Sequence, residues 1–360
     1  MDRKAFIGTA GTALTAFTVG YPSILIPKQK EKLGVALVGL GNYSRGRLAP
    51  GLQQTEHCEL RGIVTGTPSK IPIWQEEYGI PDRSVYTYET MHEIANNDDI
   101  DIIYSVTPPK LHTRDSIAGA EAGKHVWCEK PMAKTAEECQ AIIDAARKNG
   151  VYLMIGYRMQ HEPNTREIMR FAREKTYGRV EEVEAAAGFN GSWEPGDWRL
   201  SSHYGGGALY DMGVYSINAS RYASNMEPIS VMGTQYARRE EMFSEVDEHT
   251  IFDLRFRDGV TAHGKTSFGE RMNYLEVDCE DGFYSLEPFQ SYSGVQGGTS
   301  DGRELPPDPA HAQARQMDRD ALTIKQGGEP TVPGEEGLAD IRIVEAIMES
   351  SGRGGEWIDL

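Results

Sequence analysis

The first half of the chain alternates continuous apolar runs with stretches in which apolar residues recur at helical spacing. Short continuous runs are typical of parallel strands that are buried on both faces of a sheet. They are predicted at residues 35–38, 59–64, 100–106, 125–128 and 151–156. The stretches with helical spacing are residues 44–54, 73–78, 88–96, 112–122 and 136–149. This alternation predicts an α/β fold, a doubly wound parallel sheet with helices on both faces.

A predicted helix at 163–174 is followed by alternating apolar and polar residues, a pattern typical of strands with one solvated face. These segments are residues 180–189, 229–237, 251–256, 260–268 and 275–277. Arg257-Asp258-Gly259 lies between two of them and predicts a hairpin turn. Turns are expected over 291–309, and two final helices at 310–325 and 337–350. The second half is therefore predicted to be an α+β domain with a largely antiparallel, open sheet.

Composition narrows the class of protein. The 360 residues are too many for one ordinary core, so two domains are expected. The net charge is -17 and the pI is near 5.0. A protein with this excess of negative charge is repelled by nucleic-acid backbones and anionic membranes, which disfavours nucleic acid as a partner. The four cysteines are scattered and the nine histidines form no zinc-spaced cluster. Neither a disulfide framework nor a metal site is predicted.

The first 30 residues differ from the rest. Arg3-Lys4-x-Phe6 precedes an uncharged apolar run that ends near Gly20, and a membrane span needs about 20 strongly apolar residues. The segment resembles a twin-arginine export signal with Lys4 in the second basic position. We therefore predict export to the periplasm and no membrane span. The alternative is an amphipathic arm that packs on a partner subunit of a cytoplasmic protein.

A glycine-rich turn joins the first predicted strand to the first predicted helix, with the sequence Gly39-Leu40-Gly41-Asn42-Tyr43-Ser44. Glycines at such a turn let backbone N–H groups approach a pyrophosphate at the helix N-terminus. Ser44 occupies the third small position, where a small side chain lets the helix lie close to the strand. These six residues predict a dinucleotide site, and hence a Rossmann domain.

The end of the second strand indicates which dinucleotide is bound. Sites specific for NAD usually place Asp or Glu here, to accept a hydrogen bond from the ribose 2′-OH. This chain has Thr65-Gly66-Thr67-Pro68-Ser69-Lys70, without a carboxylate. The hydroxyl of Thr65 and the ammonium of Lys70 suit a 2′-phosphate. Lys70 alone would be read as a surface lysine, but the missing acid favours NADP over NAD.

Two further strand ends lie at the carboxyl edge of the sheet, where ligands bind in open α/β folds. One carries Thr107 and Pro108, followed by His112, which is read either as a cap of the next helix or as part of the cofactor cleft. The other carries Glu129-Lys130-Pro131. Lys130 lies where a nicotinamide ring is expected.

Asp211 and Tyr215 are four residues apart on a predicted helix, so both project from one side of it. Gly205-Gly206-Gly207 before that helix would let a substrate or nicotinamide approach the backbone. With Lys130, this pair supplies an ammonium, a carboxylate and a phenol, a proton-transfer set without a metal. The spacing alone favours a structural explanation, in which Asp211 interacts with the helix dipole and Tyr215 is half-buried.

Together, Gly39-x-Gly41, Glu129-Lys130-Pro131 and Asp211-x-Gly213-x-Tyr215 resemble the glucose-fructose oxidoreductase/inositol dehydrogenase (Gfo/Idh/MocA) family. The resemblance extends from about residue 33 to the C-terminus and is closest to the glucose-fructose oxidoreductase branch. Most family members have His where this chain has Tyr215, whereas that branch has Tyr. Further matching stretches are residues 122–126, 154–158, 198–200, 205–209, 219–222 and 333–337.

The resemblance implies roles for these residues. Lys130 would orient the reacting hydroxyl, Asp211 would steer that lysine, and Tyr215 would be the general acid/base. Thr65 and Lys70 match positions that hold the 2′-phosphate. Further cofactor or substrate contacts are implied at Thr107, Pro108, His112, Glu129, Arg158, Trp198, Arg199 and Tyr292.

The implied protein is an exported, NADP-dependent sugar oxidoreductase that acts on a pyranose hydroxyl and holds its cofactor while a second sugar is reduced. Its expected parts are a signal or arm (1–30), a Rossmann domain (31–157), and a substrate and oligomerisation domain (158–360). The final helices would pack back on the Rossmann domain, and the open sheet would form a homodimer or homotetramer. One alternative is a glycoside hydrolase that uses NAD for transient oxidation and elimination, against which the missing acid counts. Another is a non-catalytic sugar sensor, against which Lys130, Asp211 and Tyr215 count.

Overall fold

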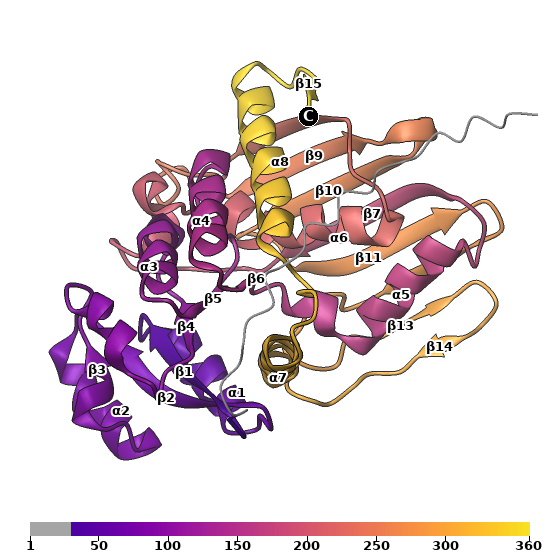
Figure 1. Cartoon of the computed structure of the whole chain (residues 1–360). Coiled ribbons are helices and arrows are strands. Elements are labelled where there is room, and N and C mark those ends of the chain that lie inside the picture. Colours follow the sequence, from indigo (N-terminus) through magenta and orange to yellow (C-terminus); the bar gives the residue numbers. More distant parts are fainter. Residues whose placement is uncertain (1–29) are drawn as a thin grey trace, which may run out of the picture.

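The computed structural model describes residues 30–360, and these form two sheets with helices packed on them (Figure 1). The predicted export signal lies outside the described residues and stays a prediction. Within residues 30–360, no helix combines the length and the apolar content that crossing a bilayer requires.

The first sheet has six parallel strands in the order β3-β2-β1-β4-β5-β6, which confirms the predicted doubly wound arrangement. The strands are β1 (Leu33–Val38), β2 (Cys58–Val64), β3 (Val85–Tyr86), β4 (Ile102–Ser105), β5 (His125–Cys128) and β6 (Leu153–Ile155). All six residues of β1 are buried, as its continuous apolar run predicts. The strand order reverses between β1 and β4, which is where open α/β sheets bind ligands.

The helices of this domain are α1 (Ala49–Leu52), α2 (Ile71–Tyr78), α3 (Pro109–Glu121) and α4 (Ala136–Asn149). The predicted helix 44–54 begins with a π-helical turn, Ser44–Leu48, and continues as α1. The predicted helix 88–96 was wrong in type, because only the 3₁₀ segment Met91–Asn96 forms. The hydroxyls of Thr87 and Thr90 accept hydrogen bonds from each other's backbone N–H groups, and this turn competes with a helix start.

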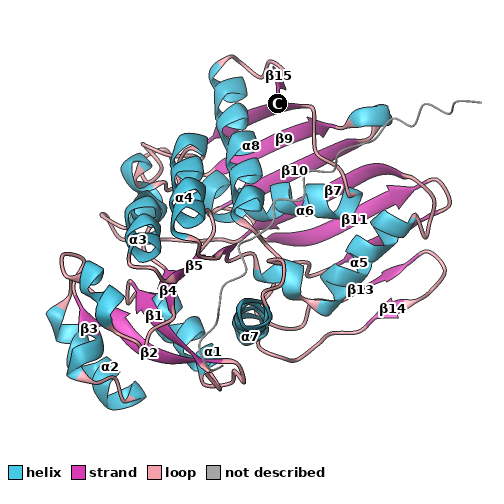
Figure 2. Ribbon diagram, in the orientation of Figure 1, coloured by secondary structure: helices cyan, strands magenta, loops and turns pink. Residues whose placement is uncertain are grey.

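The second sheet has nine strands in the order β14-β13-β12-β11-β7-β10-β9-β8-β15 (Figure 2). Their bounds are β7 (Val180–Gly188), β8 (Ser230–Tyr236), β9 (His249–Arg255), β10 (Thr261–Ser267), β11 (Met272–Cys279), β12 (Gly282–Leu286), β13 (Gly297–Thr299), β14 (Glu304–Leu305) and β15 (Ile358–Asp359). Pairing is antiparallel except between β7 and β10. The predicted turn at Asp258 and Gly259 joins β9 to β10, and both residues have positive φ.

The stretch 291–309 contains two short strands, β13 and β14, where only turns were expected. Gly297 and Gly298 hid β13, because glycine is depleted in strands and is read as a turn residue. The loop that leads into β13 closes one side of the cavity described below.

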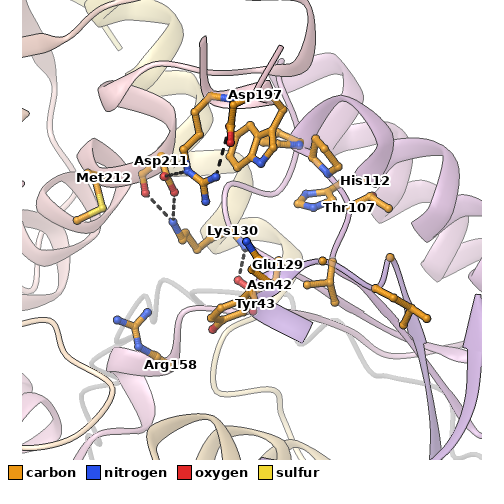
Figure 3. Close-up of a pocket in the computed structure, with 18 of the residues that line it drawn as sticks. Asn42, Tyr43, Thr107, His112, Glu129, Lys130, Arg158, Asp197, Asp211 and Met212 are labelled. Carbon is orange, nitrogen blue, oxygen red and sulfur yellow. Dashed lines mark hydrogen bonds and ion pairs between the residues drawn. The ribbon is translucent and has the colours of Figure 1, made fainter. Parts of the chain in front are cut away.

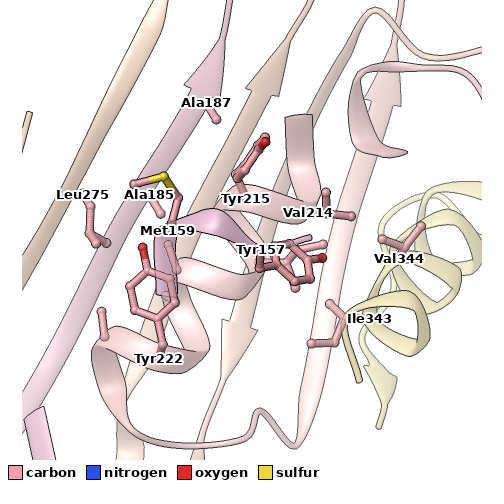
Figure 4. Close-up of a cluster of buried hydrophobic side chains, with 14 of the residues drawn as sticks. Tyr157, Met159, Ala185, Ala187, Val214, Tyr215, Tyr222, Leu275, Ile343 and Val344 are labelled. Atoms are coloured by element: carbon pink, nitrogen blue, oxygen red, sulfur yellow. The ribbon is translucent and has the colours of Figure 1, made fainter. Parts of the chain in front are cut away.

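The remaining helices are α5 (Pro163–Glu174), α6 (Val214–Ser224), α7 (Ala312–Gln326) and α8 (Gly334–Gly352). α6 packs on β7, β10 and β11, and α8 packs on β8 and against α4 of the first domain (Figure 1). The apolar cluster around α6 includes Tyr157, Val214 and Val344 (Figure 4). α7 contacts β2, and its Met317 belongs to the same buried cluster as Leu37 of β1. The two sheets are thereby held together by the C-terminal helices.

Candidate active site

A cavity of about 770 Å³ opens at the carboxyl edge of the parallel sheet and is also lined by residues of the second domain (Figure 3). It contains all but one of the site residues predicted from the sequence. Those lining it are Gly39, Leu40, Gly41, Asn42, Tyr43, Thr65, Lys70, Thr107, Pro108, His112, Glu129, Lys130, Arg158, Trp198, Arg199, Asp211, Tyr215 and Tyr292. The glycine turn and the proton-transfer set therefore share one space.

The glycine turn is shaped to admit a ligand. Gly39 has a φ of 94°, and a Cβ there would lie 2.9 Å from the Cγ2 of Thr107. By contrast, a Cβ on Gly41 would have no neighbour within 4 Å, so the space beside that backbone is open. The predicted residue outside the cavity is Ser44, which is buried and donates a hydrogen bond from Oγ to the Gly39 carbonyl at 2.5 Å. Ser44 fixes the turn from beneath.

The end of β2 presents hydroxyls and an ammonium to the cavity. Thr65, Thr67 and Lys70 line it, and Lys70 Nζ donates to the Leu40 carbonyl at 2.8 Å, across the glycine turn. An ammonium has three donors, so two remain for a ligand beside the turn. These groups fit the 2′-phosphate of NADP, which a carboxylate at the end of β2 would repel.

Lys130 and Asp211 form an ion pair in the second half of the cavity (Figure 3). Lys130 Nζ donates to the Asp211 carbonyl oxygen at 2.5 Å and to its Oδ1 at 3.0 Å. Arg199 Nε donates to the other carboxylate oxygen, Oδ2, at 3.0 Å. These contacts use two of the three ammonium donors of Lys130 and leave the third for a ligand.

Electrostatics keep this pair charged. Burial alone would raise the pKa of Asp211, but the charges of Lys130 and Arg199 outweigh it and hold the pKa below its usual value. Burial alone would lower the pKa of Lys130, but the interactions with Tyr215 and Asp211 outweigh it and hold the pKa above its usual value. At neutral pH the cavity is therefore lined by the charged ammonium of Lys130, held in place by the charged carboxylate of Asp211.

Tyr215 shares the cavity with Lys130, whose Nζ lies 4.5 Å from the centroid of the phenol ring. A guanidinium nitrogen of Arg158, Nη1, donates a hydrogen bond to Tyr215 Oη. Asp211 belongs to a π-helical turn, Leu209–Gly213, that continues directly into α6 with Tyr215 at its second residue. Such turns occur frequently at functional sites. The structure thus brings together the lysine and the phenol that lie 85 residues apart in the sequence.

The three glycines before this helix do not line the cavity, so the expectation that a ligand approaches their backbone is wrong. A Cβ on Gly207 would lie 2.2 Å from Oδ1 of Asp247, and one on Gly206 would lie 2.4 Å from the Arg199 carbonyl oxygen. The Asp247 carboxylate also accepts from Leu209 N at 2.9 Å. These glycines are needed for the close packing that begins the helix.

Glu129 and His112 line the wall around Lys130. Glu129 accepts a hydrogen bond from the Tyr104 hydroxyl at 2.7 Å, and burial raises the pKa of its carboxyl group. His112 lies inside α3, where its Nδ1 is 2.9 Å from the Pro131 carbonyl oxygen, and burial lowers its pKa. A neutral ring that donates through Nδ1 leaves Nε2 as an acceptor, and Nε2 has no partner among residues 30–360. His112 thus lies in the cavity wall and is not a helix cap.

The cavity also contains residues that the sequence interpretation missed: Thr67, Tyr88, Val106, Pro109, Phe189, Asp197, Met212, Gln290 and Ser291. Asp197 caps the 3₁₀ turn that carries Arg199, accepting from the Arg199 backbone N–H at 2.9 Å. Asp197 could have been predicted, because it directly precedes the stretch 198–200 that matches the family. Gln290 and Ser291 come from a stretch without periodicity, and nothing in the pattern marked them.

Comparison with known proteins places the chain in a family. Residues 33–157 match the model described as "Oxidoreductase family, NAD-binding Rossmann fold", and residues 165–285 match the "GFO/IDH/MocA C-terminal domain". The crystal structure of aldose-aldose oxidoreductase from Caulobacter crescentus, complexed with glycerol, superposes with a TM-score of 0.87. The two sequences are 37% identical over 91% of this chain and 100% of that one.

Two curated relatives are similar over most of their length. D-xylose 1-dehydrogenase [NADP(+)] of Haloarcula marismortui is 27% identical over 88% of this chain and 90% of its own. The 1,5-anhydro-D-fructose reductase of Ensifer adhaerens is 26% identical over 88% of this chain and 96% of its own. The family models cover both domains, so the chain belongs to the Gfo/Idh/MocA family of NAD(P)-dependent oxidoreductases.

Proposed function

We propose that this protein is an NADP-dependent sugar oxidoreductase that moves a hydride between a pyranose hydroxyl carbon and the nicotinamide. The observation that carries the proposal is the position of Lys130 and Tyr215 in the same cavity as the glycine turn. The names of the relatives support a sugar substrate, since they act on aldoses, xylose and an anhydro sugar. The reacting position is the aldose C1, giving a lactone, or ring C3.

The mechanism follows from the donors and acceptors of the cavity. NADP supplies, when bound, the nicotinamide that accepts the hydride. Lys130 donates its remaining N–H to the reacting oxygen, which stabilises negative charge there as the hydroxyl proton leaves. Tyr215 Oη takes that proton as general base. Asp211 keeps Lys130 charged and oriented, through the contacts at 2.5 and 3.0 Å.

We also propose that a second sugar completes the cycle while the cofactor stays bound. The same Tyr215 would return its proton to the carbonyl oxygen of that sugar, so the two half-reactions together release no proton. The name of the Caulobacter crescentus protein, aldose-aldose oxidoreductase, likewise pairs two aldoses. Each turnover would then consume one aldose as reductant and one as oxidant.

Lys70→Ala is expected to weaken NADP binding about 10- to 100-fold and to leave NAD binding nearly unchanged, because a charged hydrogen bond contributes about 1.5–3 kcal/mol. The measurement is calorimetric titration of the cofactor-free protein with each dinucleotide. Lys148→Ala, on the exposed end of α4, is the matched control and should change neither affinity. Equal losses for NADP and NAD in Lys70→Ala would contradict the 2′-phosphate assignment.

The function itself is tested by isotope transfer. An aldose deuterated at C1 is mixed with the NADP-loaded protein, and the cofactor is analysed by mass spectrometry. Transfer of deuterium to the nicotinamide supports aldose oxidation at C1, and transfer only from a C3-deuterated sugar moves the reaction to C3. Release of sugar from an aryl glycoside without net cofactor change would instead support a hydrolase. Sugar binding without transfer from any position would indicate a sensor.

We propose further that the protein is a homodimer or homotetramer that pairs through the nine-stranded sheet. Helices α6 and α8 cover one side of this sheet. On strands β9 and β12, Ile251 and Phe283 are each 45% exposed, large apolar side chains that a partner would bury. Sedimentation equilibrium should give at least the dimer mass, and Ile251→Glu combined with Phe283→Glu should reduce it. A monomeric wild type would contradict the proposal.

A further inference from the structure

Arg158 is a buried cation that forms no ion pair with any carboxylate of residues 30–360. Its residue is 3% exposed, in the 3₁₀ segment Arg158–His161 that follows β6. Three of its nitrogens donate hydrogen bonds, all to uncharged groups: Nη1 to Tyr215 Oη, Nη2 to Gln290 Oε1 at 2.9 Å, and Nε to the Ser291 carbonyl at 3.2 Å. Burying a charge is costly unless it is paired. Among residues 30–360, Arg158 makes no ion pair.

Arg221 is also buried, but it has carboxylate partners. It is 5% exposed and forms ion pairs with Glu227, Glu336 and Asp340 at 2.7 to 3.0 Å. Its charge is compensated by direct ion pairs, whereas Arg158 has none among residues 30–360 and interacts with the carboxyl group of Glu129 only at longer range. A guanidinium that has no direct ion pair and donates to a phenol oxygen favours the state in which that oxygen carries negative charge.

The surroundings of Tyr215 strengthen this interpretation. The guanidinium carbon of Arg158 lies 5.0 Å from the Tyr215 ring centroid and 4.8 Å from the Tyr292 centroid. The Lys130 ammonium lies 4.5 Å from the Tyr215 centroid. The phenol of Tyr215 is thus next to two cations, Lys130 and Arg158. Of these two, Lys130 forms an ion pair, with Asp211.

We infer that Arg158 is a positioning residue for the acid/base, which fixes Tyr215 Oη and stabilises its deprotonated form during hydride transfer. The inference rests on the proposed function, because it assigns Arg158 a part in the same proton transfer. When Tyr215 gives its proton to the carbonyl oxygen of the second sugar, the hydrogen bond from the Arg158 guanidinium, whose acceptor was neutral, becomes a bond between opposite charges. The proton that Tyr215 then takes from the next sugar hydroxyl returns the acceptor to its neutral form.

A second role of Arg158 is structural, since its bonds to Gln290 and Ser291 hold the loop that closes the cavity. Loss of this support lowers activity by a similar factor at every pH. Loss of the charge near Tyr215 lowers activity mainly where the phenol must be deprotonated. The pH dependence of the reaction therefore separates the two roles.

The test uses Arg158→Gln and Arg158→Lys in the NADP-loaded protein. In Arg158→Gln, the rise of kcat for sugar oxidation should move about one to two pH units higher, because a hydrogen bond to a charged group contributes about 1.5–3 kcal/mol. Activity lost at neutral pH should return at alkaline pH. Arg158→Lys should move the pH at which kcat rises in the same direction but by less. If Arg158→Gln does not fold, Arg158→Lys tests the inference in its place. Arg221→Lys is the matched buried control and should lower stability without moving the rise.

Two further measurements fix the interpretation. Guanidinium ion added to Arg158→Ala should restore part of the lost activity at neutral pH. An alkaline titration of tyrosinate absorbance, taken as the difference from Tyr215→Phe, should show the phenol of Arg158→Gln losing its proton at higher pH than that of the wild type. An unchanged titration, or a kcat lowered equally at every pH, would overturn the inference. The titration needs no turnover, so it decides the role of Arg158 even if the wild type reduces no cofactor and the proposed function fails.

Discussion

Lys130→Met is expected to lower kcat for sugar oxidation by about 10³-fold. Methionine keeps much of the length of the side chain and removes the ammonium, so the reacting oxygen loses the donor that stabilises its developing charge. The measurement is kcat of the NADP-loaded variant, together with the absorbance of the bound cofactor. The absorbance should persist, because the contact of Lys130 with Asp211 is separate from the contact of Lys70 with the glycine turn, where the phosphates would bind.

The control for this prediction is Lys134→Met. Lys134 lies four residues further along, does not line the main cavity, and donates to the His203 carbonyl at 3.1 Å. It should retain wild-type kcat to within a few-fold. A fully active Lys130→Met would remove the lysine from the mechanism and leave only a dinucleotide-binding role for this edge of the sheet.

Tyr215→Phe is expected to lower kcat by about 10²- to 10⁴-fold, the usual contribution of a positioned general acid/base. Phenylalanine keeps the ring that packs beside Lys130 and Arg158, so the fold and the sugar affinity should change little. The remaining activity should lose the pH dependence that comes from the phenol. The measurements are kcat over a range of pH and the dissociation constant of the sugar.

Tyr210→Phe provides the comparison for this variant. Tyr210 lies five residues earlier, and its hydroxyl donates to the Lys134 carbonyl at 2.7 Å, outside the main cavity. Losing that bond should cost about 1 kcal/mol of stability and leave kcat nearly unchanged. Wild-type turnover in Tyr215→Phe would show that another group accepts the proton.

The parallel half of the fold was accessible from sequence for a physical reason. Strands that are buried on both faces are continuously apolar. The run over residues 35–38 has no polar residue to face solvent, so it predicts such a strand, and all of β1 is buried. The glycine turn was accessible because backbone conformation and ligand approach both constrain it locally. By contrast, the short strand β13 could not be predicted, because two of its residues are glycines. It forms through hydrogen bonds to β12, which no local pattern records.

The candidate site was predictable only in part. Spacing placed Asp211 and Tyr215 on one helix, but spacing alone favoured a structural explanation, and the meeting with Lys130 followed only from the family resemblance. Geometry alone showed that Arg158 donates to Tyr215 and holds Gln290, since these contacts join segments more than 50 residues apart. No local pattern records such a convergence.

The most direct test of the central claim is a single-turnover experiment. The NADP-loaded protein is mixed rapidly with a panel of aldoses, and the absorbance of the reduced nicotinamide is followed. At least one aldose should produce the reduced band in the wild type, and a second, carbonyl-bearing sugar should remove it. Lys130→Met and Tyr215→Phe should give the same final band far more slowly. A wild type that produces no reduced nicotinamide with any aldose at any pH would contradict the central claim.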